Sequence, residues 1–176
     1  MTEALVIIDV QQGMFSSPEM QPYEGAATVA RIEALLIQAR ATSTLVFFVQ
    51  HDGGVGDPLA QGTPGFAFHN ALTPLASELV TIKRYCNSFQ ETDLENRLRA
   101  AGTKRLTVTG MQSDYCVDTC VRAAKERGFD IRLVADGHTT FDTPIMRASQ
   151  IIAHHNLTLG GSFAEIIECA DVSFGG

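Results

Sequence analysis

Short apolar runs alternate with segments of helical periodicity along nearly the whole chain, and this alternation is the feature that most constrains the fold. Runs typical of strands occupy residues 4–8, 45–49, 79–82, 106–109 and 131–135, and a short sixth strand is expected near 157–159. Helices are expected at residues 25–42, 93–101, 114–127 and 143–155. The strand runs lack polar alternation, as is typical of strands that are buried on both faces.

This pattern predicts an α/β fold. Successive strand–helix–strand units favour a mainly parallel sheet with helices on both faces. We therefore expect a single-domain, Rossmann-like three-layer sandwich with about six strands. The 176 residues are enough for one domain with a sizeable core, so residues 1–176 are expected to form one unit.

Three ionisable side chains that could take part in catalysis follow predicted strands. Asp9 follows the first strand, Lys83 follows the third, and Cys116 comes shortly after the fourth, in the first turn of a helix. Because the carboxyl ends of parallel strands meet at one edge, we expect the three to share a cleft. If Ser113 caps the helix, free backbone N–H groups and Lys83 would lower the pKa of the Cys116 thiol. The pattern predicts that Cys116 is a nucleophile and the most reactive of the four cysteines, with Asp9 moving protons and Lys83 stabilising charge.

The chain resembles the isochorismatase-like cysteine hydrolase family. The resemblance lies in DVQQGMF at residues 9–15, QHD at 50–52, KRYCNSF at 83–89 and GMQSDYCV at 110–117, and it extends to Asp136. It implies a catalytic triad of Asp9, Lys83 and Cys116. It also implies a cis peptide bond between Met111 and Gln112, and an oxyanion hole formed by the backbone N–H groups of Gln112 and Cys116.

Aromatic and histidine side chains beside these motifs are candidates for the substrate pocket: Phe15, His51, Tyr85 and Tyr115. His51 and Asp52 are expected to shape the pocket or a hydrogen-bond network. Residues 53–68 contain five glycines and two prolines without periodicity, which is typical of a functional loop. Because this segment follows the second strand, we expect it to form a lid or specificity loop over the same edge. A turn is expected at residues 137–140, after Asp136.

No cofactor or metal is expected. The first strand is not followed by a glycine-rich dinucleotide fingerprint. Nicotinamidases of the resembled family bind a metal through an Asp-x-His pair and a later histidine, and the QHDG sequence at residues 50–53 does not reproduce that spacing.

Nucleic acid and membranes are not expected as partners either. The net charge of −7 comes with no basic cluster, and no apolar run approaches the roughly 20 residues of a membrane span. The four cysteines lack metal-binding spacing and the chain start does not resemble a signal peptide, so a cytoplasmic, reduced protein is expected.

These features predict a cysteine hydrolase that cleaves a C–N bond of a small amide, carbamoyl compound or ureide through a thioester acyl-enzyme. One alternative is a vinyl-ether hydrolase of the isochorismatase type, although such relatives need no cysteine nucleophile. Others are a non-catalytic binding or assembly module, and a thiol redox protein that uses Cys116 and Cys120.

The resemblance also implies a homodimer or homotetramer with the pocket near a subunit boundary. Two apolar regions are expected to be covered by a neighbouring subunit. One is the loop that carries Phe66 and Phe68, and the other is the segment at residues 162–167.

Overall fold

The computed structural model describes residues 2–175. Its centre is a six-stranded, all-parallel sheet with the order β3-β2-β1-β4-β5-β6. The strands are β1 (Glu3–Ile8), β2 (Leu45–His51), β3 (Leu79–Lys83), β4 (Arg105–Met111), β5 (Asp130–Thr139) and β6 (Glu165–Ile167). The expected α/β fold is confirmed.

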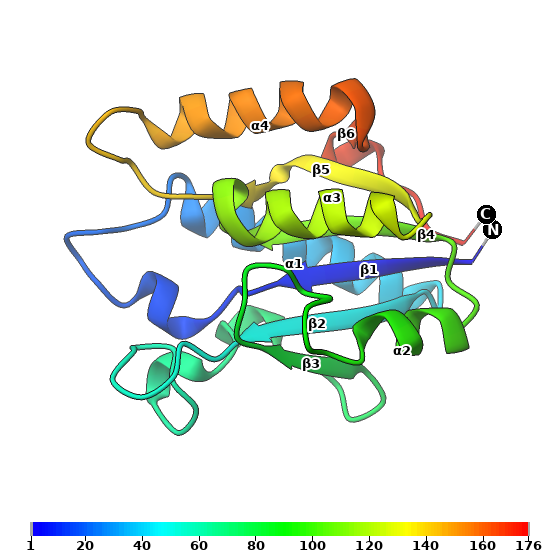
Figure 1. The fold of residues 1–176 in the computed structure, drawn as a ribbon, viewed down its shortest axis with the longest axis horizontal. Helices are drawn as coiled ribbons and strands as arrows, with labels where there is room; N and C mark the ends of the chain where they lie inside the picture. The colour runs from blue at the N-terminus through cyan, green and yellow to red at the C-terminus, as the bar shows by residue number, and fades with distance from the viewer. Residues whose placement is uncertain (1, 176) are drawn as a thin grey trace.

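Helices cover both faces of the sheet (Figure 1). They are α1 (Gly25–Ala41), α2 (Leu94–Ala100), α3 (Asp118–Glu126) and α4 (Ala148–Ser162). Side chains of β1 alternate between two apolar cores: Val6 and Ile8 pack on the side of α2, α3 and α4, and Leu5 and Ile7 pack on the side of α1. This alternation follows from the two-residue period of a strand and explains why the strand runs are apolar throughout.

The strand order places a topological switch beside β1. The connections from β1 lead to β2 and β3 on one side, and β4, β5 and β6 lie on the other. Open parallel sheets bind ligands outside the carboxyl ends of the strands at such a switch. Figure 1 shows the long connections after β1, β2 and β5 together at this edge, on the left, opposite the two chain termini.

The sixth strand lies elsewhere than expected. Residues 157–159 belong to α4, and the strand is β6, a few residues later. Ala148, Ile151 and Leu159 are the buried residues of α4, and they share one face at helical spacing. Leu157 is 80% exposed, so this short apolar pattern is part of a helix face.

Two other boundaries also differ from the prediction. The helix expected at residues 143–155 begins only at Ala148, whose backbone N–H donates to Asp142 Oδ1 at 2.8 Å. The turn expected at residues 137–140 is wrong, because β5 continues through residue 139 past an irregularity in its pairing with β4. No helix within residues 2–175 is long and apolar enough to cross a membrane.

Candidate active site

Asp9 and Lys83 form a buried ion pair at the carboxyl edge of the sheet. Asp9 follows β1 and Lys83 ends β3, and the Lys83 Nζ lies 2.6 Å from Asp9 Oδ2 with both side chains fully buried. Asp9 has a left-handed backbone (φ 51°), and its N–H donates to the carbonyl oxygen of Val49 at 2.9 Å. The other carboxylate oxygen, Oδ1, has no hydrogen-bond partner among residues 2–175. A buried carboxylate with a free oxygen is suited to accept a proton.

Cys116 completes the cluster. The Lys83 Nζ donates to Cys116 Sγ at 3.2 Å, so one ammonium contacts both the carboxylate and the sulfur. The three residues come from the ends of three strands and meet although 33 and 74 residues separate them in sequence. This is the spatial arrangement expected from the sequence.

The segment after β4 delivers Cys116 through an unusual turn. The peptide bond between Met111 and Gln112 is cis, as the family resemblance implied. A π-helical turn, Ser113–Val117, then leads into α3, so the helix expected at residues 114–127 consists of two parts. The backbone N–H of Gln112 has no hydrogen-bond partner in the described part of the chain. This leaves a donor in the segment that leads to Cys116.

The expected depression of the thiol pKa is wrong for the resting site. Burial raises the pKa of the Cys116 thiol above its ordinary value, the Asp9 carboxylate raises it further, and Lys83 offsets these effects only in part. The thiol is therefore protonated at neutral pH. Cys116 is also buried, at 8% exposure, whereas Cys86 is the exposed cysteine of the four.

Lys83 keeps its charge in this setting. Burial alone would lower the pKa of Lys83, but the Asp9 carboxylate and the Cys116 sulfur together raise it above its ordinary value. Removing either member of a buried ion pair leaves an uncompensated buried charge, and this strongly destabilises the fold. The resting site is thus a buried cluster of one ammonium, one carboxylate and one thiol.

Ser113 does not cap the helix, contrary to the prediction. No side chain caps the turn, and the buried Ser113 hydroxyl lies 2.7 Å from His138 Nδ1. The His138 Nε2 lies 2.9 Å from Asn156 Oδ1. Because an amide oxygen can only accept, His138 donates from Nε2 and accepts the Ser113 proton at Nδ1. These three side chains fasten the nucleophile turn to β5 and α4.

Lowering the pH should weaken the fold through His138. Burial lowers the pKa of His138 to about 4. An unfolded histidine titrates near 6.5, so the unfolded chain binds the proton first as the pH falls. The contribution of neutral His138 to folding stability is complete above about pH 6.5 and is lost as the pH falls towards 4. The loss in the free energy of unfolding amounts to about 3 kcal/mol.

Urea unfolding at neutral pH and near pH 4.5 measures this loss. His138→Gln should unfold with a smaller difference between the two pH values than the wild type. His154→Gln, on the exposed face of α4, is the control and should keep the wild-type difference. Equal pH dependence in the wild type and His138→Gln would contradict the assignment.

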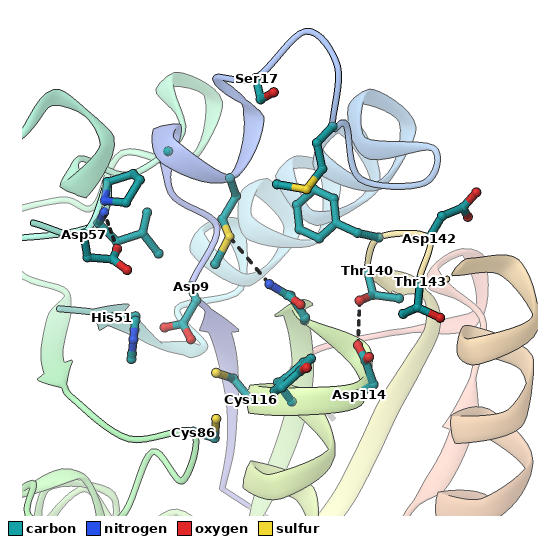
Figure 2. A pocket seen from close by; sticks show the side chains of 18 residues that line it. Asp9, Ser17, His51, Asp57, Cys86, Asp114, Cys116, Thr140, Asp142 and Thr143 are labelled. Carbon is teal, nitrogen blue, oxygen red and sulfur yellow. Dashed lines mark hydrogen bonds between the residues drawn. The ribbon is translucent and has the colours of Figure 1, made fainter. Parts of the chain in front are cut away.

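A cavity of about 510 Å³ lies over Cys116 (Figure 2). Its walls include Asp9 and Cys116, together with Met14, Gln112, Thr140 and Phe141. The cavity draws on the connections after β1, β2, β3, β4 and β5, with Cys86 coming from the connection after β3. A volume of this size accommodates a small organic molecule.

The four predicted pocket residues fall into two groups. His51 and Tyr115 line the cavity. Phe15 does not, because its ring packs edge-on against His69 at a centroid distance of 5.0 Å. Tyr85 lies outside as well, beside a separate cavity of about 190 Å³, where its hydroxyl donates to Glu91 at 3.2 Å.

His51 and Asp52 have separate roles, in line with the expectation of a pocket residue or a network. Burial, and secondly the charge of Lys83, lower the pKa of His51, so the imidazole is neutral at neutral pH. Its Nδ1 lies 3.4 Å from Lys83 Nζ, which leaves Nε2 to carry the proton. Asp52 is buried and accepts from the backbone N–H of Gly54 and from the Arg84 guanidinium, so it shapes the following loop.

The loop at residues 53–68 folds onto its own subunit. Gln11 holds its base, since Gln11 Nε2 donates to the carbonyl oxygens of His51 at 3.0 Å and Phe66 at 2.9 Å. Phe68 packs against Phe48 in the core at a centroid distance of 5.3 Å. Asp57, Pro58 and Leu59 from the same loop line the cavity. The loop therefore forms part of the cavity wall from within the same chain.

Several residues of the site were not identified from the sequence. Gln11 and Asp114 lie inside the quoted motifs, and their proximity to Asp9 and Cys116 was the available signal. Asp57, Phe141 and Asp142 come from irregular connections, where no periodicity predicts the direction of a side chain. Within residues 2–175, no group of three or more His, Cys, Asp or Glu side chains is arranged to hold a metal ion.

The parallel sheet and the Asp-Lys-Cys cluster at its carboxyl edge are the features of a hydrolase of the isochorismatase type. The isochorismatase domain matches residues 3–168, and the chain belongs to the isochorismatase family. A solved structure of an isochorismatase from Pseudomonas putida has a TM-score of 0.91 at 31% identity, covering 97% of this chain and 90% of that one.

Sequence relatives support the same assignment. An uncharacterized isochorismatase family protein of Bacillus subtilis is 34% identical over 94% of this chain and 96% of its own length. Streptothricin hydrolase of Streptomyces noursei is 37% identical over 81% of this chain, which spans about half (51%) of that relative. Maleamate amidohydrolase of Pseudomonas putida is 30% identical over 72% of this chain and 67% of its own length.

Proposed function

We propose that this protein hydrolyses a C–N bond of a small amide, carbamoyl compound or ureide through a thioester on Cys116. The observation that carries the proposal is the contact of one buried ammonium, Lys83, with both a carboxylate at 2.6 Å and a sulfur at 3.2 Å under a cavity. Two relatives whose names state a substrate, streptothricin hydrolase and maleamate amidohydrolase, also support a hydrolase.

The first half of the reaction transfers the acyl group to sulfur. Asp9 accepts the thiol proton as Cys116 Sγ attacks the carbonyl carbon, so the high thiol pKa is overcome only when the electrophile is in place. Lys83 stabilises the developing negative charge on sulfur. The carbonyl oxygen takes up the electron pair and is met by the backbone N–H groups of Gln112 and Cys116.

The second half releases the products. The tetrahedral intermediate collapses, the C–N bond breaks, and Asp9 returns the proton to the departing nitrogen. A water molecule then gives a proton to Asp9 and attacks the thioester, and the acid leaves as Cys116 regains its proton. Lys83 stays protonated throughout, in keeping with the raised pKa of its ammonium.

Trapping the acyl-enzyme tests this function. Intact-mass spectrometry after rapid acid quench, across a panel of simple amides, carbamoyl compounds and ureides, should show an adduct of the acyl mass on Cys116. Release of the amine without a corresponding adduct, and with full activity after Cys116 is alkylated, would exclude the thioester route.

Two alternatives are less well supported. A vinyl-ether hydrolase has no need of a thiol in contact with a buried ammonium and carboxylate. A thiol redox role for Cys116 and Cys120 requires access to the second thiol, but Cys120 is fully buried and burial raises the pKa of its thiol to about 11. A non-catalytic module would give no acyl adduct in the trapping experiment.

We propose a homodimer or homotetramer in the cytoplasm. The apolar regions first expected to be covered by a neighbour pack within the chain: Phe68 packs on Phe48, and Phe163 and Ile166 pack against the core. The most exposed large apolar side chains are Val55 (109%) in the loop, Ile145 (92%) just before α4 and Leu157 (80%) in α4. Light scattering at micromolar concentration should give at least twice the 19.0 kDa chain mass. All four cysteines are free, which suits a reducing compartment.

A further inference from the structure

The cavity over Cys116 is strongly acidic. Four carboxylates line it, Asp9, Asp57, Asp114 and Asp142, and no lysine or arginine among the described residues does so. Figure 2 shows Asp57 on one side of Asp9 and Cys116, and Asp114 and Asp142 on the other. The carboxylates thus give the cavity wall negative charge only, and a substrate must be compatible with that charge.

Two of these carboxylates are neutralised within the chain. Asp9 pairs with Lys83 at 2.6 Å, and Asp142 pairs with Arg147 at 2.6 Å. Asp57 and Asp114 form no ion pair with any described residue. Asp57 Oδ1 accepts from the Leu59 N–H at 2.7 Å, and Asp114 Oδ1 accepts from the Thr140 hydroxyl. The second oxygen of each receives no hydrogen bond from the described chain.

Unpaired carboxylates in the cavity disfavour the negative charge that develops in the proposed reaction, unless a positive charge offsets theirs. Asp114 lies in the same turn as Cys116, two residues earlier, and negative charge there disfavours both a thiolate and an oxyanion. A positive charge on the substrate would remove this cost. The interaction is substantial because a partly enclosed cavity screens charges less than water does.

The cavity is also a ligand site on independent grounds. Asp9 lines it with a fully buried side chain, and its Oδ1 has no hydrogen-bond partner among residues 2–175. The remaining walls are largely apolar, with Met14, Met20, Leu59 and Phe141 around the acidic groups. The lining therefore fits a molecule with an apolar body and a cationic end.

We propose that the preferred substrates are cationic amides, in which an ammonium, amidinium or guanidinium group away from the scissile bond binds Asp57 and Asp114. This inference rests on the proposed function and adds the class of substrate. Anionic amides are disfavoured, because a substrate carboxylate would face Asp57 and Asp114 without a basic partner.

A matched substrate series tests the charge preference. ω-Amino amides, alkyl amides of equal length and ω-carboxy amides of equal length differ in charge and little in size. At low ionic strength kcat/KM should be about tenfold higher for the cationic than for the neutral member, and lower again for the anionic one. The preference should shrink as salt is added. Equal rates for the three members, or faster cleavage of the anionic one, would overturn the inference.

Variants that each remove one carboxylate charge test which residues cause the preference for cationic amides. Asp114→Asn and Asp57→Asn keep the side-chain shape and the Oδ1 acceptor, and each should reduce the cationic-to-neutral ratio by about threefold, or ~0.7 kcal/mol. Asp171→Asn removes an exposed charge outside the cavity and should keep the wild-type ratio. A ratio unchanged in both cavity variants would refute the assignment of these carboxylates.

A binding measurement separates this inference from the proposed function. Calorimetric titration of Cys116→Ala with the same three amides reports recognition without turnover. Tighter binding of the cationic amide without any acyl adduct on the wild-type protein supports the acidic pocket and overturns the thioester mechanism. Adduct formation without a charge preference in binding or rate supports the mechanism and overturns the cationic substrate.

Discussion

Replacing Cys116 by serine should lower kcat/KM at least ~10³-fold for any amide that the wild type cleaves. A hydroxyl is a far weaker acid than a thiol, so the Asp9 carboxylate cannot remove its proton as the bond to carbon forms. The fold should be retained, because oxygen fits the space of sulfur and Lys83 can donate to it in place of Sγ. Amine release, with the melting temperature measured in parallel, checks both expectations.

Cys120→Ser is the matched control. Cys120 is buried in the first turn of α3, four residues after Cys116, and it makes no contact with the cavity. Its replacement should leave kcat/KM within about threefold of the wild type, apart from any loss of stability from a buried hydroxyl. Activity of Cys116→Ser close to that of the wild type would show that another group is the nucleophile.

Gly110→Ala should destabilise the protein by about 3–5 kcal/mol and disrupt the site together with the fold. A Cβ at this position would come within 2.1 Å of the Ile8 carbonyl oxygen, and the residue has φ +120°. The contact is with backbone of the central strand, so a side-chain rotation cannot relieve it. Since β1 ends beside Asp9 and β4 leads to Cys116, separating the strands should also separate the catalytic groups.

Urea unfolding measures the loss, and Gly161→Ala is its control. Gly161 lies in α4 with open space around its Cβ direction, so alanine should be neutral or stabilising by up to about 1 kcal/mol. If Gly110→Ala unfolds at the same urea concentration as the wild type, the close approach of β1 and β4 is not as tight as described.

The catalytic cluster could be predicted from the sequence because strand ends have a defined place in a parallel sheet. Asp9 and Lys83 each follow an apolar run directly, so their positions need no knowledge of the loops. The pocket lining could not be predicted in the same way. Phe15 and Tyr85 flank motif residues in sequence, but a short 3₁₀ helix, Gln12–Phe15, directs Phe15 towards His69, and an irregular loop directs Tyr85 towards the surface.

The thiol pKa and the sixth strand show the limits of local reasoning. The pattern around Cys116 contains the helix start that lowers a thiol pKa, but burial and the neighbouring Asp9 are tertiary effects and they dominate. Leu157 and Leu159 alternate like strand residues, but the helix continues through them because Leu159 extends the face set by Ile151. A short apolar run does not distinguish the two cases.

The anchoring of the loop at residues 53–68 bears on how new substrate preferences arise in such a protein. Its base is tied to β2 and to the segment after β1 by Gln11 and Gln50, both of which donate to the carbonyl oxygen of Phe66. Between these ties, Asp57, Pro58 and Leu59 line the cavity, whereas the Asp9–Lys83 pair lies at the ends of β1 and β3. Substitutions between residues 53 and 65 can thus accumulate under selection for a different substrate without changing the groups that cleave the bond. Substrate recognition can then evolve separately from the catalytic chemistry.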